Sequence, residues 1–524
     1  MKELTGAAAK VSAGTVVSRI LGYLRDMLVA QFFGAGVFAD AFYAAYRIPN
    51  LIRRLLGEGS VSAAVIPVLS AVRAESGDEE AQKLLTILFT LLVIILGAVT
   101  AAGVIFAREL VSLIAYGFAE SPEKLNLTIA LTRLMFPFVF FVSMAALAAG
   151  YLNTYGIFFA PAVAPAALSV SEIGFILALA PLLSPDNQIK GLAISVIIGG
   201  AGQLAYQIPA IIKLGVKFRP CFSFGHPGVK KIAALMAPAT IGISVDQVNS
   251  FVDTMCASFL PLGSVTALYY SNRLMQLPLA IFAIALSTAA LPAMSKAAAD
   301  GNPQALKETL NYSLRMMFFA IVPSTVGLMV FGLPIIKLLF ERGRFDAGAS
   351  LMTYSALAFY AFGLPAYSAV KIFASAFYAR KETAVPVKVA AFSMTINAAL
   401  NILLMQRFAV GGLAMATAIS SAFNAFWLFI ILRRQIGPLG ARKIARTLGK
   451  TAVAAAAMCL ASYCVFLVVP GAVNGSIYAF AAIAVGTAAY AAAAKALGME
   501  ELDDLVLIIT DKINRVTGRV NSGR

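Results

Sequence analysis

The chain has 524 residues, of which 60% are hydrophobic and 13% are charged, and its mean hydropathy is +0.85. Soluble domains have about 45–50% apolar and about 25% charged residues, so this composition excludes a water-soluble fold and predicts an all-α polytopic membrane protein. The formal net charge is +16, but the basic residues lie in short segments between apolar runs, which argues against a nucleic-acid-binding face.

The N-terminal apolar run is interrupted by charges, so it lacks the continuous stretch of a cleaved secretory signal. It predicts a first helix over residues 8–32 and a second over 36–57. An ionised side chain at bilayer depth costs at least about 2.5–3.5 kcal/mol, so charges in these helices mark a pathway or a binding site. The charged residues are Arg19, Arg25, Asp26, Asp40, Arg47, Arg53 and Arg54.

Further helices are predicted where about 20 apolar residues follow one another, which is enough to cross about 30 Å of hydrocarbon. Five such segments carry no charge: Leu84 to Ala107, Gly191 to Ile212, Leu274 to Ser295, Ala347 to Val370 and Phe408 to Leu432. The charge-free stretches Leu134 to Ser171 and Thr451 to Ala494 each predict two helices, joined by turns at 153–156 and 470–475. Further runs that contain polar residues lie near 231–259, 311–333 and 384–405, and the run near 159–183 is the second helix of the pair that begins at Leu134. The sequence therefore predicts fourteen transmembrane helices.

The loops on one side of these helices are rich in Lys and Arg, which predicts that this side is cytoplasmic. They include Lys213, Lys217, Arg219, Lys230, Lys231, Arg380, Lys381, Arg433, Arg434, Arg442, Lys443, Arg446 and Lys450. An even number of helices places both termini on that side. We expect a multi-pass protein of the bacterial inner membrane.

Short motifs recur at an offset of about 225 residues, as Phe42 to Arg47 with Leu268 to Arg273, and Pro67 with Pro292. The repeat predicts two pseudo-symmetric six-helix lobes in one orientation, with a substrate site between them. We place the N-terminal lobe at 1–220 and the C-terminal lobe at 221–445. Two additional helices follow at 446–498, and a cytoplasmic tail with a short surface helix at 499–524.

The intramembrane arginines suit an anionic diphosphate, because guanidinium stays charged and offers a planar fork of donors. Arg25 and Arg273 each have long apolar flanks, and Arg273 is the repeat counterpart of Arg47. Two alternatives remain open. Arg53 and Arg54 could reach the interface, and Arg25 could pair with Asp26 or Asp40.

A second polar group lies in the C-terminal half, where Asp253, Asn397, Asn401 and Thr417 offer oxygen ligands within apolar helices. Oxygen ligands suit a hard cation, so we expect a sodium site here, with sodium or the membrane potential as the coupling force. The alternative is that Asp253 is protonated or hydrogen-bonded and that the asparagines bridge helices.

The sequence gives little indication of metal binding, nucleotide binding or catalysis. Three of the four cysteines lie in apolar runs, and the single histidine, His226, has no cluster of metal ligands around it. The segment Leu448 to Thr451 resembles the end of a P-loop but lacks the earlier glycine. We expect no organic cofactor and no enzymatic activity.

Two segments near the N-terminus carry a family resemblance: Asp40 to Phe42, and Pro49 to Leu55 followed by Gly57 to Gly59. With Ser18 to Asp26, Phe33 to Gly36 and Tyr269 to Leu274, they closely resemble the MurJ (MviN) family of the MOP exporter superfamily. The resemblance covers nearly the whole chain. It implies fourteen helices and a flippase for lipid II, the undecaprenyl-diphosphate-linked disaccharide peptide of peptidoglycan.

By this resemblance, Arg25, Arg53 and Arg273 correspond to essential cavity arginines, and Arg19, Asp26 and Asp40 to other sensitive positions. We therefore expect all six residues to belong to the substrate-binding site. Helical phasing alone favours Arg54, whereas the motif favours Arg53. The resemblance also implies that the last two helices form a groove for the polyprenyl tail. Lipid II and membrane lipids are the expected partners, and nucleic acid is not.

Three rivals remain. The first is an exporter of a different substrate on the same fold, either another polyprenyl-diphosphate saccharide or a drug cation, and a cation exporter would need an acid-lined cavity. An enzyme acting on the lipid diphosphate would need a catalytic cluster at the interface. A structural scaffold would leave the intramembrane arginines unexplained.

Overall fold

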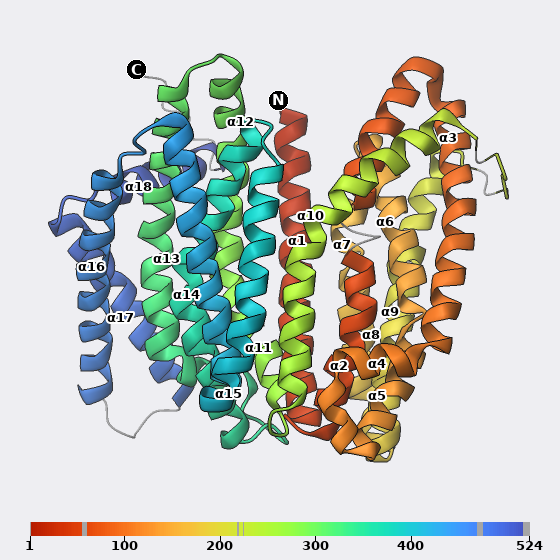
Figure 1. The fold of residues 1–524 in the computed structure, drawn as a ribbon, viewed down its shortest axis with the longest axis horizontal. Helices are drawn as coiled ribbons and strands as arrows, with labels where there is room; N and C mark the ends of the chain where they lie inside the picture. The colour runs from red at the N-terminus through yellow and green to blue at the C-terminus, as the bar shows by residue number, and fades with distance from the viewer. Residues whose placement is uncertain (1, 55–59, 217–218, 224, 469–474, 517–524) are drawn as a thin grey trace. The chain divides into compact units, whose positions relative to one another are not determined.

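In a computed structural model of the chain, the described residues are 2–54, 60–216, 219–223, 225–468 and 475–516. Every regular element in these ranges is a helix, as Figure 1 shows. The chain divides into an N-terminal unit, Met1–Thr266 with Phe340–Ala349, and a C-terminal unit, Ala267–Leu339 with Ser350–Arg524. The all-α membrane fold predicted from composition is confirmed.

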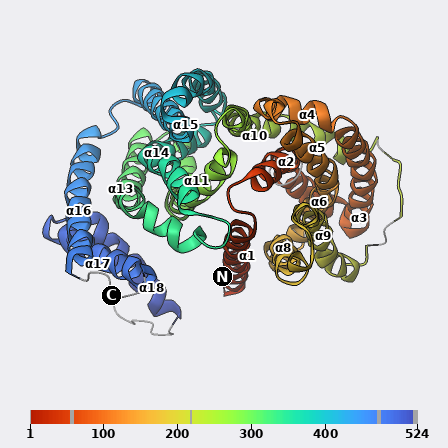
Figure 2. The ribbon, with the colours of Figure 1, turned by 90° about the horizontal axis from the view of Figure 1, so that it is seen from below.

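The N-terminal unit is built from long helices with short helices between them. Its elements are α1 (Lys2–Phe33), α2 (Val37–Arg53), α3 (Ser60–Ile105), α4 (Ala107–Ile114), η2 (Tyr116–Glu120), α5 (Pro122–Met135), α6 (Phe138–Thr154), α7 (Phe159–Val163), α8 (Ala166–Ala178), η3 (Ala180–Leu182), α9 (Pro185–Lys213) and α10 (Pro227–Ser258). Helix α8 packs against both α1 and α9, and Figure 2 shows α8 beside α9. Helix α6 packs between α3 and α9.

Small residues allow α8 and α9 to approach closely, as is common for helices in membranes. A Cβ atom added at Gly199 of α9 would lie 2.6 Å from the Cα atom of Leu168 on α8. The ring of Phe175 on α8 fills the space beside Gly191 in the same way. The close contact fixes the side chains of α8 relative to the rest of the unit.

The C-terminal unit contains α11 (Ser264–Pro278), η4 (Leu279–Ile284), α12 (Ala285–Ala299), α13 (Pro303–Phe340), α14 (Ala347–Ala379), α15 (Ala384–Ile436), α16 (Ala441–Val468), α17 (Gly475–Ala496) and α18 (Glu500–Val516). Helices α16 and α17 lie side by side (Figure 2). They join α13 through a core that includes Phe319, Met458 and Tyr490. The hydroxyl of Tyr490 donates to the carbonyl oxygen of Phe319 at 2.6 Å.

Most predicted spans coincide with helices of the structure. Helix α15 contains two of them, because its backbone leaves the helical region at Ala409, between the predicted segments 384–405 and 408–432. The predicted turn at 153–156 also falls at a helix end, whereas most of the turn at 470–475 lies outside the described residues. Sequence reasoning missed the short helices α4 and α5, which precede the predicted start at Leu134.

Within the described residues, nine helices are long and apolar enough to cross a membrane, or ten if the bent pair Ala481–Ala496 and Glu500–Leu507 counts as one span. The 53-residue α15 is one of the nine although it is long enough for two crossings. Charge-bearing α1, α2 and α10 are not among the nine. The count of fourteen therefore stays a prediction.

The repeat is visible in the positions of the helices along the chain. Helices α1 and α10 each have 32 residues and begin at Lys2 and Pro227, about 225 residues apart. Short motifs in the sequence thus indicated matching helix positions in the two halves. The boundary between the compact units, at Thr266, places α10 with the N-terminal unit. The predicted lobe boundaries near 220 and 445 stay predictions.

Candidate functional site

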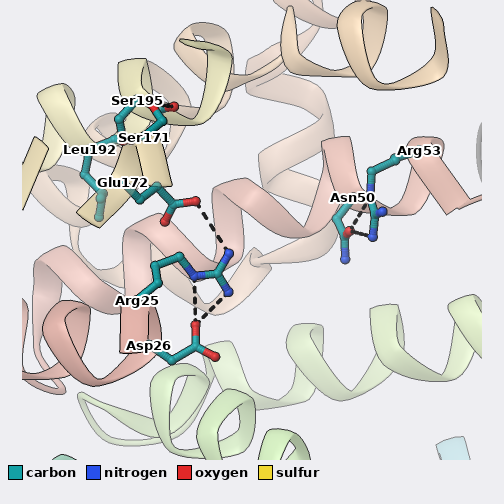
Figure 3. A network of polar contacts seen from close by, with 8 residues as sticks. All are labelled: Arg25, Asp26, Asn50, Arg53, Ser171, Glu172, Leu192 and Ser195. Carbon is teal, nitrogen blue, oxygen red and sulfur yellow. Dashed lines mark hydrogen bonds and ion pairs between the residues drawn. The ribbon is translucent and has the colours of Figure 1, made fainter. Parts of the chain in front are cut away.

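Arg25 lies between two carboxylates in the N-terminal unit (Figure 3). Its Nη2 and Nε atoms donate to Oδ1 of Asp26 at 2.7 and 3.0 Å. Its Nη1 atom lies 3.6 Å from Oε1 of Glu172, on α8. The side chains are 11% exposed for Arg25, 1% for Asp26 and 4% for Glu172. A partly buried guanidinium therefore faces two acids, and its bond to Asp26 is the pairing of Arg25 with Asp26 that the sequence left open.

The packing of α8 positions Glu172 for this contact. The hydroxyl of Ser171 donates to the carbonyl oxygen of Ser195 on α9 at 2.8 Å, beside Glu172 (Figure 3). Together with the close approach at Gly199, this bond holds α8 against α9 while the opposite side of α8 packs on α1. The carboxylate of Glu172 is therefore carried by a rigid element.

Arg53 ends α2 and its guanidinium bonds within the same helix (Figure 3). Its Nε and Nη2 atoms donate to Oδ1 of Asn50 at 3.0 and 2.8 Å. Both Arg53 and Arg54 are partly buried, so burial does not distinguish the two candidates. The assignment of Arg53 rather than Arg54 rests on the motif.

Asp40 on α2 is 1% exposed and accepts four hydrogen bonds. Its Oδ2 atom accepts from Lys124 Nζ at 2.9 Å and from the backbone N–H of Gly263 at 2.9 Å. Its Oδ1 atom accepts from the backbone N–H and the hydroxyl of Thr266 at 3.0 and 2.7 Å. A carboxylate with these partners has little capacity left for a ligand, so the geometry favours positioning over the substrate contact expected from the resemblance.

The remaining predicted residues lie elsewhere. Arg19 is exposed on α1, and Arg273 is partly buried on α11 of the C-terminal unit. Arg47, the repeat counterpart of Arg273, donates from Nε to the hydroxyl of Thr254 on α10 at 2.9 Å. Among the predicted site residues, the structure shows a direct contact between Arg25 and Asp26. A diphosphate site shared by Arg25, Arg53 and Arg273 stays a prediction.

The asparagines of the predicted sodium site form a chain of hydrogen bonds in the C-terminal unit. The amide of Asn401 donates to Oδ1 of Asn397 at 3.1 Å, and the amide of Asn397 donates to the hydroxyl of Thr417 at 3.1 Å. These bonds join the two parts of α15, as the bridging alternative expects. Asp253 is buried on α10 of the N-terminal unit. A sodium site that combines Asp253 with Asn397, Asn401 and Thr417 stays a prediction.

Sequence reasoning missed Glu172 and Lys124. Glu172 stands immediately after the charge-free stretch that ends at Ser171, so a lone acid in an apolar run was the available signal. Lys124 lies before the predicted helix start at Leu134 and was not among the candidate residues, yet its side chain is 9% exposed and pairs with Asp40.

Comparison with known proteins gives a consistent family. Residues 29–482 match the family described as lipid II flippase MurJ. The lipid II flippase MurJ of Burkholderia cenocepacia is 35% identical over 433 residues, covering 82% of this chain and 84% of that protein. A probable lipid II flippase MurJ of Bdellovibrio bacteriovorus is 32% identical and covers 96% of both chains.

Solved structures agree on the fold. A structure of lipid II flippase MurJ in an inward closed conformation superposes with a TM-score of 0.77 at 27% identity, covering 95% of this chain and 99% of that one. An inward-facing MATE family multidrug transporter of the MOP superfamily gives 0.69 at 13% identity, covering 83% and 98%, and shows the fold alone. With a family match over most of its length and relatives above 30% identity, the chain belongs to the lipid II flippase MurJ family.

Proposed function

We propose that this chain is a lipid II flippase, which moves the undecaprenyl-diphosphate-linked peptidoglycan precursor from the cytoplasmic to the outer leaflet of the bacterial inner membrane. The observation that carries the proposal is the match to lipid II flippases along nearly the whole chain, 35% identical over 82% of its length. The transporter fold of the relatives supports movement of a substrate rather than its chemical conversion. We expect no enzymatic activity.

The partly buried guanidinium of Arg25 gives the proposal a chemical basis. A diphosphate head group needs cationic donors inside a low-dielectric environment, and an arginine fork supplies two donors at once. Arg25 lies on α1 among apolar segments and is already held by carboxylates, which keep the cation in place before substrate arrives. We propose Arg53 and Arg273 as further diphosphate ligands, and Arg19 and Asp26 as further residues of the substrate site. Asp40 holds Lys124 and the start of α11 in place.

The charge pattern supports the proposed orientation of the chain in the membrane. The loops rich in Lys and Arg are proposed to face the cytoplasm, with both termini on that side. Alternating exposure of the site to the two leaflets would then carry the head group outward. The apolar helices α16 and α17 are proposed to hold the polyprenyl tail, which would remain in the hydrocarbon layer throughout.

The coupling force is proposed to be the membrane potential, sodium or both. An inside-negative potential favours outward movement of an anion by about 2.3 kcal/mol per charge per 100 mV. A sodium ion bound at Asp253 would then act on the return step, by binding one state of the empty carrier more tightly than the other. Cysteine accessibility with and without sodium, in the wild type and Asp253→Asn, tests this site. An identical response in both proteins would eliminate it.

Depletion of the protein in its host tests the function. If the chain is the flippase, lipid II accumulates in the cytoplasmic leaflet as the protein is lost, and expression of the wild type restores its appearance in the outer leaflet. A distribution of lipid II between the leaflets that is unchanged on depletion would contradict the proposal.

A further inference from the structure

Glu172 is a buried acid with unusually few partners. It is 3% exposed, and within the described part of the chain its carboxylate accepts no hydrogen bond. Its one charged partner there is Arg25, at 3.6 Å from Nη1 to Oε1. An ionised carboxylate removed from water is costly unless it is paired and hydrogen-bonded, so Glu172 depends on Arg25 for its negative charge.

Arg25 does not depend on Glu172 to the same degree. The Nε and Nη2 atoms of Arg25 bond to Asp26 at 3.0 and 2.7 Å, and Nη1 is the atom turned toward Glu172 (Figure 3). A second anion that approached the guanidinium would therefore displace Glu172 more easily than Asp26. The displaced carboxylate would be left in an apolar helix without its cation, and it would bind a proton.

We propose that Glu172 is a proton-binding site coupled to the substrate, so that an anionic diphosphate lipid and the ionised Glu172 carboxylate compete for Arg25. The inference rests on the proposed function, because it requires that Arg25 meet the diphosphate. In the empty carrier Glu172 is ionised and pairs with Arg25. In the loaded carrier the diphosphate takes its place and Glu172 holds a proton.

The surroundings of Glu172 contain few other groups that could take the proton. Helices α1 and α9 and the short η3 pack against α8. From α1, Arg25 and Asp26 face Glu172, and Asp26 is engaged with Arg25 by two hydrogen bonds. On α9 the charged residue nearest in sequence to Ser195 is Lys190, which is exposed, and η3 has no titratable residue. Glu172 is thus the acid that loses its partner when the guanidinium is taken.

The sign of the pH effect follows from this exchange. Binding of the lipid is accompanied by uptake of a proton wherever Glu172 is ionised in the empty carrier. The affinity for the lipid then falls as the pH rises, by up to about tenfold per pH unit for one proton. A diphosphate esterified at both ends keeps its charge across the neutral range, so the lipid does not add a pH dependence of its own.

Equilibrium binding of a short-chain lipid II to the purified full chain in nanodiscs, between about pH 6 and about pH 8, tests the inference. The wild type should bind at least about fivefold more weakly at the higher pH. Glu172→Gln, which stays neutral, should bind with less than about twofold change, and Glu172→Asp should keep the slope. Glu80→Gln, at an acid paired with Lys83 and His226 on another part of the unit, is the matched control and should behave as the wild type.

The outcomes separate the two proposals. Equal pH slopes in the wild type and Glu172→Gln, with both proteins folded by their thermal transitions, would overturn the role of Glu172 and leave the flippase proposal intact. Failure of the folded wild type to bind short-chain lipid II at any pH would overturn both. A flat profile in Glu172→Gln with a sloped profile in the wild type and Glu172→Asp would support the inference.

Discussion

At the residue scale, Asp40 and Lys124 form a buried ion pair whose carboxylate accepts four hydrogen bonds. The ammonium of Lys124 meets the carboxylate at 2.9 Å and lies 3.9 Å from the ring centroid of Phe118. The other donors to Asp40 come from the start of α11, where Gly263 and Thr266 have backbone N–H groups that lack partners inside that helix. Asp40 therefore caps the first residues of α11, which up to Thr266 belong to the same unit as α2.

Loss of the Asp40 carboxylate is predicted to lower the free energy of unfolding. Asp40→Ala leaves the Lys124 ammonium and two backbone donors buried without their acceptor, so we expect a loss of about 3–5 kcal/mol in unfolding free energy. Adding Lys124→Met to Asp40→Ala should recover part of the lost unfolding free energy, because the buried ammonium that lacks its acceptor is then removed. Thermal unfolding of the two single variants and the double variant measures the coupling.

The exposed pair of Lys83 and Glu80 provides the control. The side chain of Lys83 is 53% exposed, so Lys83→Met should change stability by less than about 1 kcal/mol. Strictly additive effects of the Asp40 and Lys124 substitutions would contradict a coupled buried pair.

Arg25 differs from Asp40 in how closely its two acids approach it. Asp26 accepts two hydrogen bonds from the guanidinium, whereas Glu172 stays beyond hydrogen-bond distance at 3.6 Å. Asp40, with four hydrogen bonds, therefore has a structural position, and Arg25, between two unequally close acids, has the proposed functional one. Sequence reasoning placed both residues in one group, because intramembrane charge alone does not report the number of partners.

At the element scale, the break in α15 separates its two spans. Ala409 adopts φ 47° and ψ −126°, a region that favours glycine, and Gly411 and Gly412 follow it. A Cβ atom on Gly412 would overlap the carbonyl oxygen of Leu404. Only glycine therefore fits at position 412 without a shift of the backbone. The unfavourable backbone conformation of the turn lies at Ala409.

Two substitutions at this break are predicted to act in opposite directions. Gly412→Ala should lower the free energy of unfolding by about 1–3 kcal/mol, because the backbone must move to make room for the methyl group. Ala409→Gly should leave stability unchanged or raise it by about 1 kcal/mol, because the positive φ costs glycine nothing. Equal losses at both positions would show that the break has a different backbone from the one described.

Helix α18 contacts α13 and α16 through a buried acid, in addition to the packing of Leu502 on the core around Phe319. Glu501 is 3% exposed, lies 2.9 Å from Nη1 of Arg315 on α13, and accepts from the hydroxyl of Thr447 on α16 at 3.0 Å. Glu500 contacts the same arginine at 3.1 Å, but its side chain is 79% exposed. Glu501 should therefore contribute much more than Glu500 to the attachment of α18.

We predict that Glu501→Ala releases α18 from α13 and α16, whereas Glu500→Ala does not. The release should appear as faster amide hydrogen exchange over residues 500–516, because local opening exposes the backbone of the helix. Exchange that is accelerated equally in the two variants would show that the buried contact does not hold the helix.

The sequence predicted elements better than it predicted contacts. Apolar runs located most helices, because a span of hydrocarbon length must satisfy its backbone internally whatever it packs against. The pairing of Asp40 with Thr266 joins residues 226 positions apart, and no periodicity within one helix reports it. Glu172 was missed for the same reason, since its role depends on the helix that lies across from it.

At the scale of the whole molecule, the charge pattern predicts the topology. The segment between α9 and α10 is basic, and the turn after α10 at Leu262 carries no charge. A single cysteine introduced at Leu262 should react with a membrane-impermeant thiol reagent added outside the cell. Cys221 should react only after the membrane is permeabilised. Labelling at Leu262 exclusively from the cytoplasm would contradict the orientation. The second predicted outside position, near Asn474, lies outside the described residues.

The most direct test of the central claim is lipid II translocation by the purified chain in proteoliposomes, scored by the fraction of lipid that reaches the opposite leaflet. The wild type should move lipid II, and Arg25→Lys, which keeps the charge but not the two-donor fork, should be at least about tenfold slower while remaining folded. Lys83→Met should match the wild type. Absence of translocation by a folded wild type, or an undiminished rate in Arg25→Lys, would contradict a flippase that holds its diphosphate substrate through Arg25.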